Sequence, residues 1–175
     1  GVETDTLDAE GQVVAEHDMA PPDPEQVHAA AATLTGVIQQ VPPMVSAVHV
    51  DGRRLHELAR EGIEVEREPR TVTVQRFELS ATSDPMVWDA VVECSSGTYV
   101  RSLAADLGRA LGGGAHLAAL RRTAVGPFTL DEATPLEELR LLPPAEAVRH
   151  LPRGVVDDEG AEDLRHGRFL DPAAL

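Results

Sequence analysis

Between residue 86 and residue 111 the spacing of apolar residues changes abruptly, and this change restricts the folds that the chain can adopt. In residues 86–94 every second side chain is apolar, which is typical of a strand with one buried face. In residues 100–111 apolar side chains recur every three or four positions, as on the buried stripe of a helix. Only the short turn Ser95–Tyr99, which contains Gly97, separates the two patterns. We therefore expect a strand that leads directly into a helix.

The rest of the chain shows the same two patterns, separated by turns rich in Gly, Pro and Asp. Asp23 is a suitable N-cap for one helix, and Gly62 is a suitable C-terminal cap for another. A turn is expected at Asp51–Gly52, and a strand start that runs out at Leu175. These patterns predict an α+β fold, a mostly antiparallel sheet with helices packed on it. Further strands are expected at residues 4–17 (a hairpin that turns at 8–11), 41–50, 70–82 and 115–128, and further helices at 24–34, 53–62, 134–139, 143–150 and 157–167.

Composition restricts the setting of the protein. The formal net charge is −15, and all 15 basic residues are Arg. An acidic chain argues against phosphate binding over its whole surface, but the four arginines of residues 101–122 are compatible with a local RNA-binding patch. The single Cys94 excludes a disulfide framework and a cysteine-based zinc site, and it favours a reducing, cytoplasmic setting. No apolar run approaches the ~18 residues of a membrane span. The first residue is Gly1, so we expect the sequence to begin inside a longer protein.

Arg101 is the most unusual residue in a chain that lacks the standard catalytic signatures. There is no GxSxG, HExxH or Walker motif, and the histidines show no metal-ligand spacing. Arg101 falls in the first turn of an expected helix, where the helix dipole disfavours a cation. Free backbone N–H groups, the guanidinium and the Tyr99 ring would together suit a nucleotide or another anion. Taken alone, this motif is explained better by a structural Tyr beside an Arg that pairs with a carboxylate, because ion-pair networks are common. No carboxylate partner for Arg101 is evident nearby in the sequence.

A longer pattern at residues 42–79 and 94–128 favours the first interpretation. Its most specific parts are "GTYVRSLAADLG" and "GAHLAALRR". In order and spacing this pattern resembles the tRNA pseudouridine synthase B (TruB) family. The resemblance implies an enzyme that flips out the T-loop uridine at tRNA position 55 and isomerises it to pseudouridine, without a metal or an organic cofactor. It also implies that the T-arm stem-loop of tRNA is the partner, and we expect a monomer.

The resemblance also suggests a division of the chain into domains. Residues 1–150 correspond to the C-terminal part of the family's catalytic domain. The tail "DEGAEDLRHGRFL" resembles the opening of a PUA-type RNA-binding domain. We therefore expect residues 151–175 to begin such a domain.

Three site residues follow from the resemblance. Arg101 would pair with the catalytic Asp that does the covalent work, and Tyr99 and Leu120 would line the uracil pocket. Tyr99 could contribute only its ring face, but we expect it to be catalytic, with its hydroxyl taking part in proton transfer at carbon five of uracil. The family's Gly-x-Leu-Asp loop, which carries the nucleophile, does not occur in this sequence, and Asp5 and Asp8 match a different region. We therefore expect these 175 residues to be inactive alone.

Four further arginines are candidates for contacts with tRNA. Arg53 and Arg54 could grip phosphates, although arginines among glutamates also form ordinary solvated faces. Arg121 and Arg122 fall in an expected strand, so one would face RNA and the other a structural carboxylate. Two alternatives to an enzyme remain open at this point. The chain could be a tRNA-binding module without catalysis, or a truncated remnant that does not fold alone.

Overall fold

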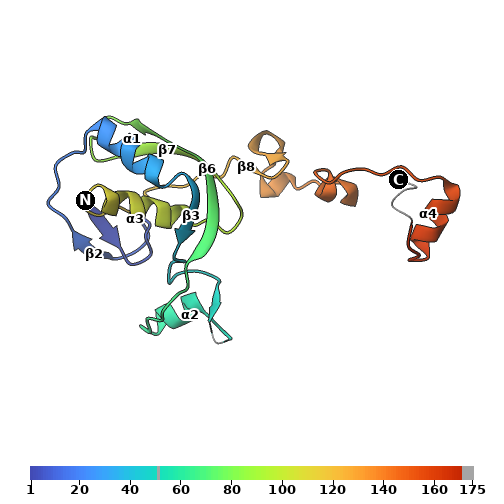
Figure 1. The fold of residues 1–175 in the computed structure, drawn as a ribbon, viewed down its shortest axis with the longest axis horizontal. Helices are drawn as coiled ribbons and strands as arrows, with labels where there is room; N and C mark the ends of the chain where they lie inside the picture. Colours follow the sequence, from blue (N-terminus) through green and yellow to red (C-terminus); the bar gives the residue numbers. More distant parts are fainter. Residues whose placement is uncertain (51, 171–175) are drawn as a thin grey trace. The chain divides into compact units, whose positions relative to one another are not determined.

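The computed structural model describes residues 1–50 and 52–170, and these residues form helices and antiparallel sheets (Figure 1). Packing divides the chain into two compact units, Gly1–Leu120 and Arg121–Leu175. The mixture of helices and antiparallel sheets confirms the α+β class that the sequence predicts. The boundary expected at residue 150 separates family domains rather than packing units, and it stays a prediction.

The first unit is organised around a three-stranded antiparallel sheet with the order β3-β6-β7. The long central strand β6 (Arg70–Ala81) pairs with β7 (Trp88–Cys94) and with β3 (Gly36–Gln40). Strands β6 and β7 confirm the sequence prediction, whereas β3 was not predicted. Its polarity is inverted, because Val37 is 72% exposed and Gln40 only 2% exposed. A search for buried apolar and exposed polar residues therefore misses it.

Two helices, α1 (Pro24–Thr33) and α3 (Val100–Ala110), pack together, and α1 also packs on β6. The predicted N-cap Asp23 accepts a hydrogen bond from the Glu25 N–H at 2.8 Å, so α1 begins where the sequence indicates. The small side chains of α1 let it approach the sheet closely. The core beneath the helices consists of Val27, Ala31 and Leu79, with Phe77, Trp88, Leu107 and Leu111 packed against it.

A hairpin of β1 (Val2–Thr4) and β2 (Val13–Glu16) precedes α1, as the sequence predicts. Its turn is joined to the segment after α3. The Leu117 N–H donates to the Leu7 carbonyl and the Ala9 N–H donates to the Leu117 carbonyl, each over 3.0 Å. The hairpin turn is therefore fixed against the part of the chain that follows α3.

The prediction of a continuous strand at residues 115–128 is wrong. This stretch contains the isolated bridge at Leu117 and one strand of two residues, β8 (Ala124–Val125), and it ends in the two-residue strand β9 (Phe128–Thr129). The backbone groups of Leu117 bond to the hairpin turn instead of a neighbouring strand, so no ladder extends from it. An apolar pattern without a partner strand does not make a sheet.

The chain between β3 and β6 forms a small substructure of its own. It contains β4 (His49–Val50), β5 (Arg53–Arg54) and α2 (Leu55–Arg60). Gly62 follows α2 with φ of 72°, the left-handed conformation expected of a glycine that ends a helix. The expected turn at Asp51–Gly52 falls partly outside the described residues, because Asp51 is not among them.

The second unit consists of short elements. The two short helices expected at 134–139 and 143–150 are 3-10 turns. The expected C-terminal helix is α4 (Asp158–Arg165), which is followed by Gly167 with φ of 68°. The strand start expected near Leu175 lies largely outside the described residues, which end at residue 170. The elements of this unit are the β8-β9 pair, η1 (Leu130–Glu132), η2 (Leu136–Glu138), η3 (Pro144–Val148) and α4 (Asp158–Arg165).

A methyl group at Gly108 should disrupt the packing of α3 against the loop that follows it. A Cβ atom there would lie 2.6 Å from the carbonyl carbon of Gly114. We expect Gly108→Ala to lower the free energy of unfolding by about 1–3 kcal/mol, since overpacked cores lose this much. Urea denaturation of the purified protein measures it. Arg109→Ala, at the neighbouring exposed position, should change stability by no more than ~0.5 kcal/mol. Equal stability of the two variants would show that the loop can move away.

Candidate functional site

The turn between β7 and α3 places Tyr99 and Arg101 at the start of the helix, as the sequence predicts. Gly97 has φ of 82°, a conformation that most other residues avoid, and it lets the chain reverse over a few residues. Tyr99 is the N-cap residue, with extended backbone, and its carbonyl accepts the Leu103 N–H at 3.1 Å. Arg101 therefore lies in the first helical turn, beside the N–H groups that have no partner within the helix.

Arg101 has a carboxylate partner, Asp8, which comes from a distant part of the sequence. Its Nη1 donates to Asp8 Oδ2 and to the Thr6 carbonyl, each at 3.0 Å, and its Nη2 donates to the Val45 carbonyl at 2.8 Å. Both side chains of the ion pair are partly buried, at 23% exposure for Arg101 and 24% for Asp8. Asp8 lies 93 residues earlier in the chain, and only the position of the β1-β2 turn reveals it.

The β1-β2 turn holds Asp8 in its ionised form. Its Oδ1 accepts the Thr6 hydroxyl at 2.6 Å and the Glu10 N–H at 3.2 Å. Partial burial alone would raise the pKa of Asp8, but these hydrogen bonds and the charge of Arg101 lower that pKa below its ordinary value of 3.8. Asp8 therefore presents a fixed negative charge to the guanidinium.

Gln40 is a site residue that sequence reasoning missed. Its amide hydrogen-bonds to both backbone groups of Tyr99, at 2.7 Å and 3.1 Å. The only hint in the sequence is a glutamine at the end of a short run that looks too polar for a buried strand.

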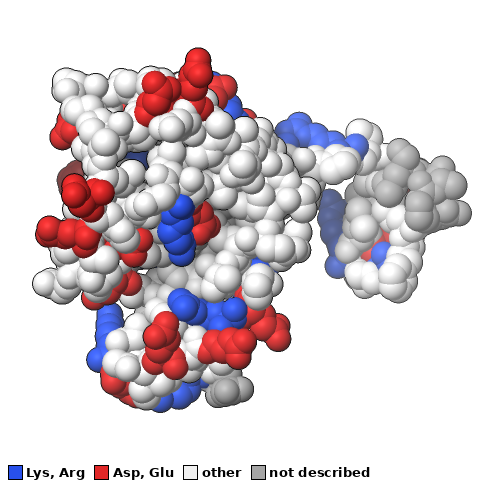
Figure 2. Space-filling view, turned by 60° about the vertical axis from the view of Figure 1, so that its left-hand side comes forward, with Lys and Arg blue, Asp and Glu red and all other residues white. Residues whose placement is uncertain are grey.

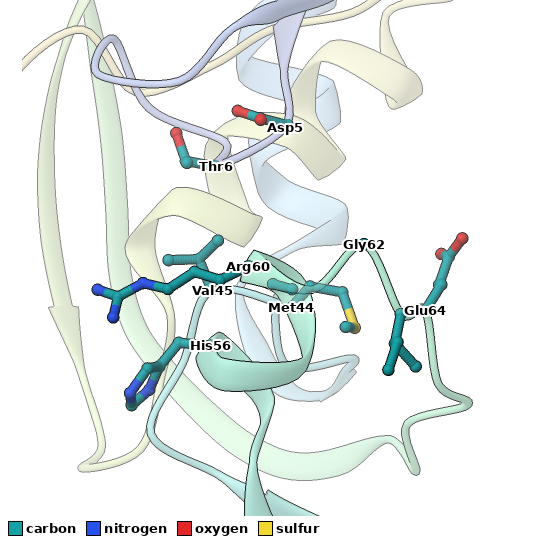
Figure 3. Close-up of a pocket in the computed structure, with 10 residues that line it drawn as sticks. Asp5, Thr6, Met44, Val45, His56, Arg60, Gly62 and Glu64 are labelled. Atoms are coloured by element: carbon teal, nitrogen blue, oxygen red, sulfur yellow. The ribbon is translucent and has the colours of Figure 1, made fainter.

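A cavity of about 490 Å³ adjoins the Arg101 network (Figure 3). Thr6 and Val45, whose carbonyls bind Arg101, line it. In Figure 3, His56 and Arg60 of α2 extend to the same side of the cavity. The other lining residues are Asp5, Met44, Ala59, Gly62, Ile63 and Glu64. The cavity thus combines an apolar lining with basic groups along one side, an arrangement that can accept a flat, partly polar ligand.

The remaining predicted arginines lie on the surface. Arg53 pairs with Glu61 at 2.5 Å, and Arg54 is exposed. Acidic and basic side chains are close neighbours over the part of the first unit that contains α2 (Figure 2). Arg121 and Arg122 are exposed and lie outside any strand, so the expectation that one faces a structural carboxylate across a strand was wrong in its premise.

Leu120 is the last residue of the first unit and is 60% exposed. The structure thus brings Arg101 to the hairpin turn and Tyr99 to Gln40, while Leu120 remains open to solvent. Within residues 1–50 and 52–170, no cluster of three His, Cys, Asp or Glu side chains could hold a metal ion. No helix of this part of the chain is long and apolar enough to cross a membrane.

Comparison with known proteins yields two family matches. The model of "TruB family pseudouridylate synthase (N terminal domain)" matches residues 1–100, and that of "tRNA pseudouridylate synthase B C-terminal domain" matches residues 101–148. Similar curated proteins, each called tRNA pseudouridine synthase B, come from Rhodococcus jostii (50% identity over 100% of this chain and 61% of the relative) and Symbiobacterium thermophilum (51% identity over 95% and 58%). The chain thus spans about three fifths of the length of these relatives.

Replacing Asp8 should weaken the fold in a pH-dependent way. Asp8→Asn removes the charge opposite Arg101, and a hydrogen bond to a charged group is worth on the order of 1.5 kcal/mol at least. Because the folded protein lowers the pKa of Asp8, the stabilisation is present above pH 3.8 and is lost as the pH falls through the lowered value. Urea melts should therefore separate Asp8→Asn from the wild type at neutral pH and bring the two together in acid.

Asp5→Asn is the matched control for this measurement. Asp5 lies in the same turn and accepts one hydrogen bond from the Gln12 N–H through Oδ1, an atom that Asn retains. We expect it to change the free energy of unfolding by less than ~0.5 kcal/mol at any pH. A constant difference between Asp8→Asn and the wild type at all pH values would contradict the ion pair.

Proposed function

Because this chain belongs to the TruB family of pseudouridylate synthases, we propose that it is part of an enzyme that isomerises a uridine of tRNA to pseudouridine. The observation that carries the proposal is the Arg101 network, which fixes a guanidinium at a helix start beside a cavity. We further propose the T-loop uridine of the T-arm as the substrate, a cytoplasmic monomer as the working form, and chemistry that needs neither metal nor organic cofactor.

Arg101 is proposed to hold the nucleophilic Asp. A guanidinium carries five N–H donors in a rigid plane, and the contacts to Thr6, Asp8 and Val45 fix that plane. The donors that remain can bind a second carboxylate with two parallel hydrogen bonds. A guanidinium within hydrogen-bonding distance lowers the pKa of a carboxyl group, so the nucleophilic Asp would stay ionised. Since the Gly-x-Leu-Asp loop does not occur in these 175 residues, the nucleophile would be supplied from outside them.

The uracil is proposed to be bound beside Tyr99 and Leu120. A base flipped out of an RNA loop loses its stacking and must regain it in the pocket. The Tyr99 ring can supply an aromatic face and Leu120 an apolar wall. Arg53, Arg54, Arg121 and Arg122 are exposed, as phosphate-binding residues must be, and each is a candidate for sequence-independent contacts with the T-arm.

The activity can be tested with the full-length gene product and the 175-residue chain side by side. Each is incubated with unmodified tRNA, and pseudouridine is mapped along the RNA. We expect the full-length product to convert the T-loop uridine and the 175-residue chain to convert none. A tRNA with cytidine at that position is the control. Binding of tRNA without conversion by the full-length product would favour a binding module. Turnover by the 175-residue chain alone would show that its own residues supply the nucleophile.

The proposed role of Arg101 predicts that a positive charge at this position is not enough for normal turnover. Arg101→Lys keeps the positive charge but loses the planar fork that holds a carboxylate in one orientation. We expect Arg101→Lys and Arg101→Ala each to lower kcat of the full-length enzyme by about a hundredfold or more. The KM for tRNA should change little, since affinity arises from many phosphate contacts. Arg109→Lys, later in the same helix and exposed, is the control. Single-turnover kinetics decide; near-normal turnover of Arg101→Lys would contradict the role.

A further inference from the structure

Gln40 is a fully buried amide at the end of β3. It is 2% exposed and pairs in register with Arg70 of the central strand β6. A primary amide that is removed from water must find hydrogen-bond partners inside the protein, or its burial is unfavourable. The hydrogen bonds that its side chain makes therefore indicate the role of Gln40.

The Gln40 amide binds the backbone of a single residue in two directions. Its Nε2 donates to the Tyr99 carbonyl at 3.1 Å, and its Oε1 accepts the Tyr99 N–H at 2.7 Å. The two peptide groups on either side of the Tyr99 Cα are thereby held together. Because these bonds constrain both backbone dihedrals of Tyr99, they set the direction in which its side chain leaves the helix start.

The turn that carries Tyr99 is fixed at both ends by neighbouring strands. At its beginning, the Ser95 N–H donates to the Thr73 carbonyl at 2.8 Å, and the Thr73 N–H donates to the Ser95 hydroxyl at 3.0 Å. At its end, Gln40 of β3 holds Tyr99. Ser95 is held by the backbone of Thr73 in β6, whereas Tyr99, which adjoins the helix, is held by the side chain of Gln40.

We propose that Gln40 is a positioning residue for the candidate site, one that fixes Tyr99 and, two residues later, the guanidinium of Arg101 relative to the flipped uracil. The proposal rests on the proposed function and goes beyond it by assigning a role to a residue that touches no substrate. Gln39, the preceding residue, points to the opposite face of the strand and is exposed, with its Nε2 donating to the Thr71 hydroxyl at 2.9 Å. It is therefore a matched control.

The kinetic test uses Gln40→Met, Gln40→Glu and Gln39→Met in the full-length gene product. Gln40→Met fills the same space without hydrogen bonds, and we expect it to lower kcat at least about tenfold while the KM for tRNA changes less than about twofold. Gln39→Met should match the wild type. A normal kcat for a folded Gln40→Met enzyme would overturn the proposal.

Gln40→Glu adds a second measurement, the pH dependence of kcat, which would not change if Gln40 had only a structural role. Its carboxylate can accept the Tyr99 N–H, but only the protonated acid can also donate to the Tyr99 carbonyl. Burial raises the pKa of such a carboxyl group, which brings its titration into a measurable range. The kcat of Gln40→Glu relative to the wild type should therefore rise as the pH falls. A ratio that is independent of pH would contradict positioning by the amide, even if Gln40→Met is too unstable to assay.

Amide hydrogen exchange tests the contact without reference to activity. In Gln40→Met, peptides that contain Tyr99 should exchange faster, whereas peptides from the centre of β6 and from the second half of α3 should not change. Unaltered exchange at Tyr99 would refute the contact itself. If the wild-type enzyme leaves tRNA unmodified but exchange at Tyr99 still responds to Gln40, the proposed function fails and the contact stands, so the two failures are distinguishable.

Discussion

The guanidinium of Arg101 is the interaction on which the geometry of the candidate site depends. It joins the start of α3 to the β1-β2 turn through Asp8 and Thr6, and to the segment before β4 through Val45. A cation in the first turn of a helix is disfavoured by ~0.3–1 kcal/mol, while a charge-assisted hydrogen bond contributes about 1.5–3 kcal/mol. The contacts with the hairpin turn therefore outweigh the dipole, and one residue can connect three segments.

Two polar side chains from distant parts of the chain hold the start of α3, and the two positions that they hold, Tyr99 and Arg101, are two residues apart. Gln40 fixes the backbone of Tyr99 from 59 positions away, and Asp8 binds Arg101 from 93 positions away. The first is a neutral amide enclosed by the sheet, and the second is an ion pair at the edge of a cavity. A neutral anchor is insensitive to nearby charge, so the backbone of Tyr99 stays fixed even where charged groups surround Arg101.

Local signals in the sequence predicted most of the regular structure of the first unit. Asp23 marked the start of α1, and Gly62 the end of α2, because caps depend on the chemistry of a few neighbouring residues. The predictions failed where the structure of a segment depends on which distant segment it pairs with. β3 buries Gln40 and exposes Val37, and the stretch around Leu117 bonds to a hairpin turn instead of a strand. The same reason hid Asp8 as the partner of Arg101, whereas the roles of Tyr99, Leu120 and the surface arginines stay predictions.

The sequence by itself determined the α+β class, the turn that delivers Tyr99 and Arg101 to a helix start, and the resemblance to a family that the comparisons confirm. These follow from short-range periodicity, from cap chemistry and from motifs a few residues long. The tertiary structure alone decided which carboxylate faces Arg101, which amide holds Tyr99 and where the adjoining cavity lies. Such contacts join residues far apart in the chain. Their partners are chosen by the packing of whole strands and helices, which no local pattern records.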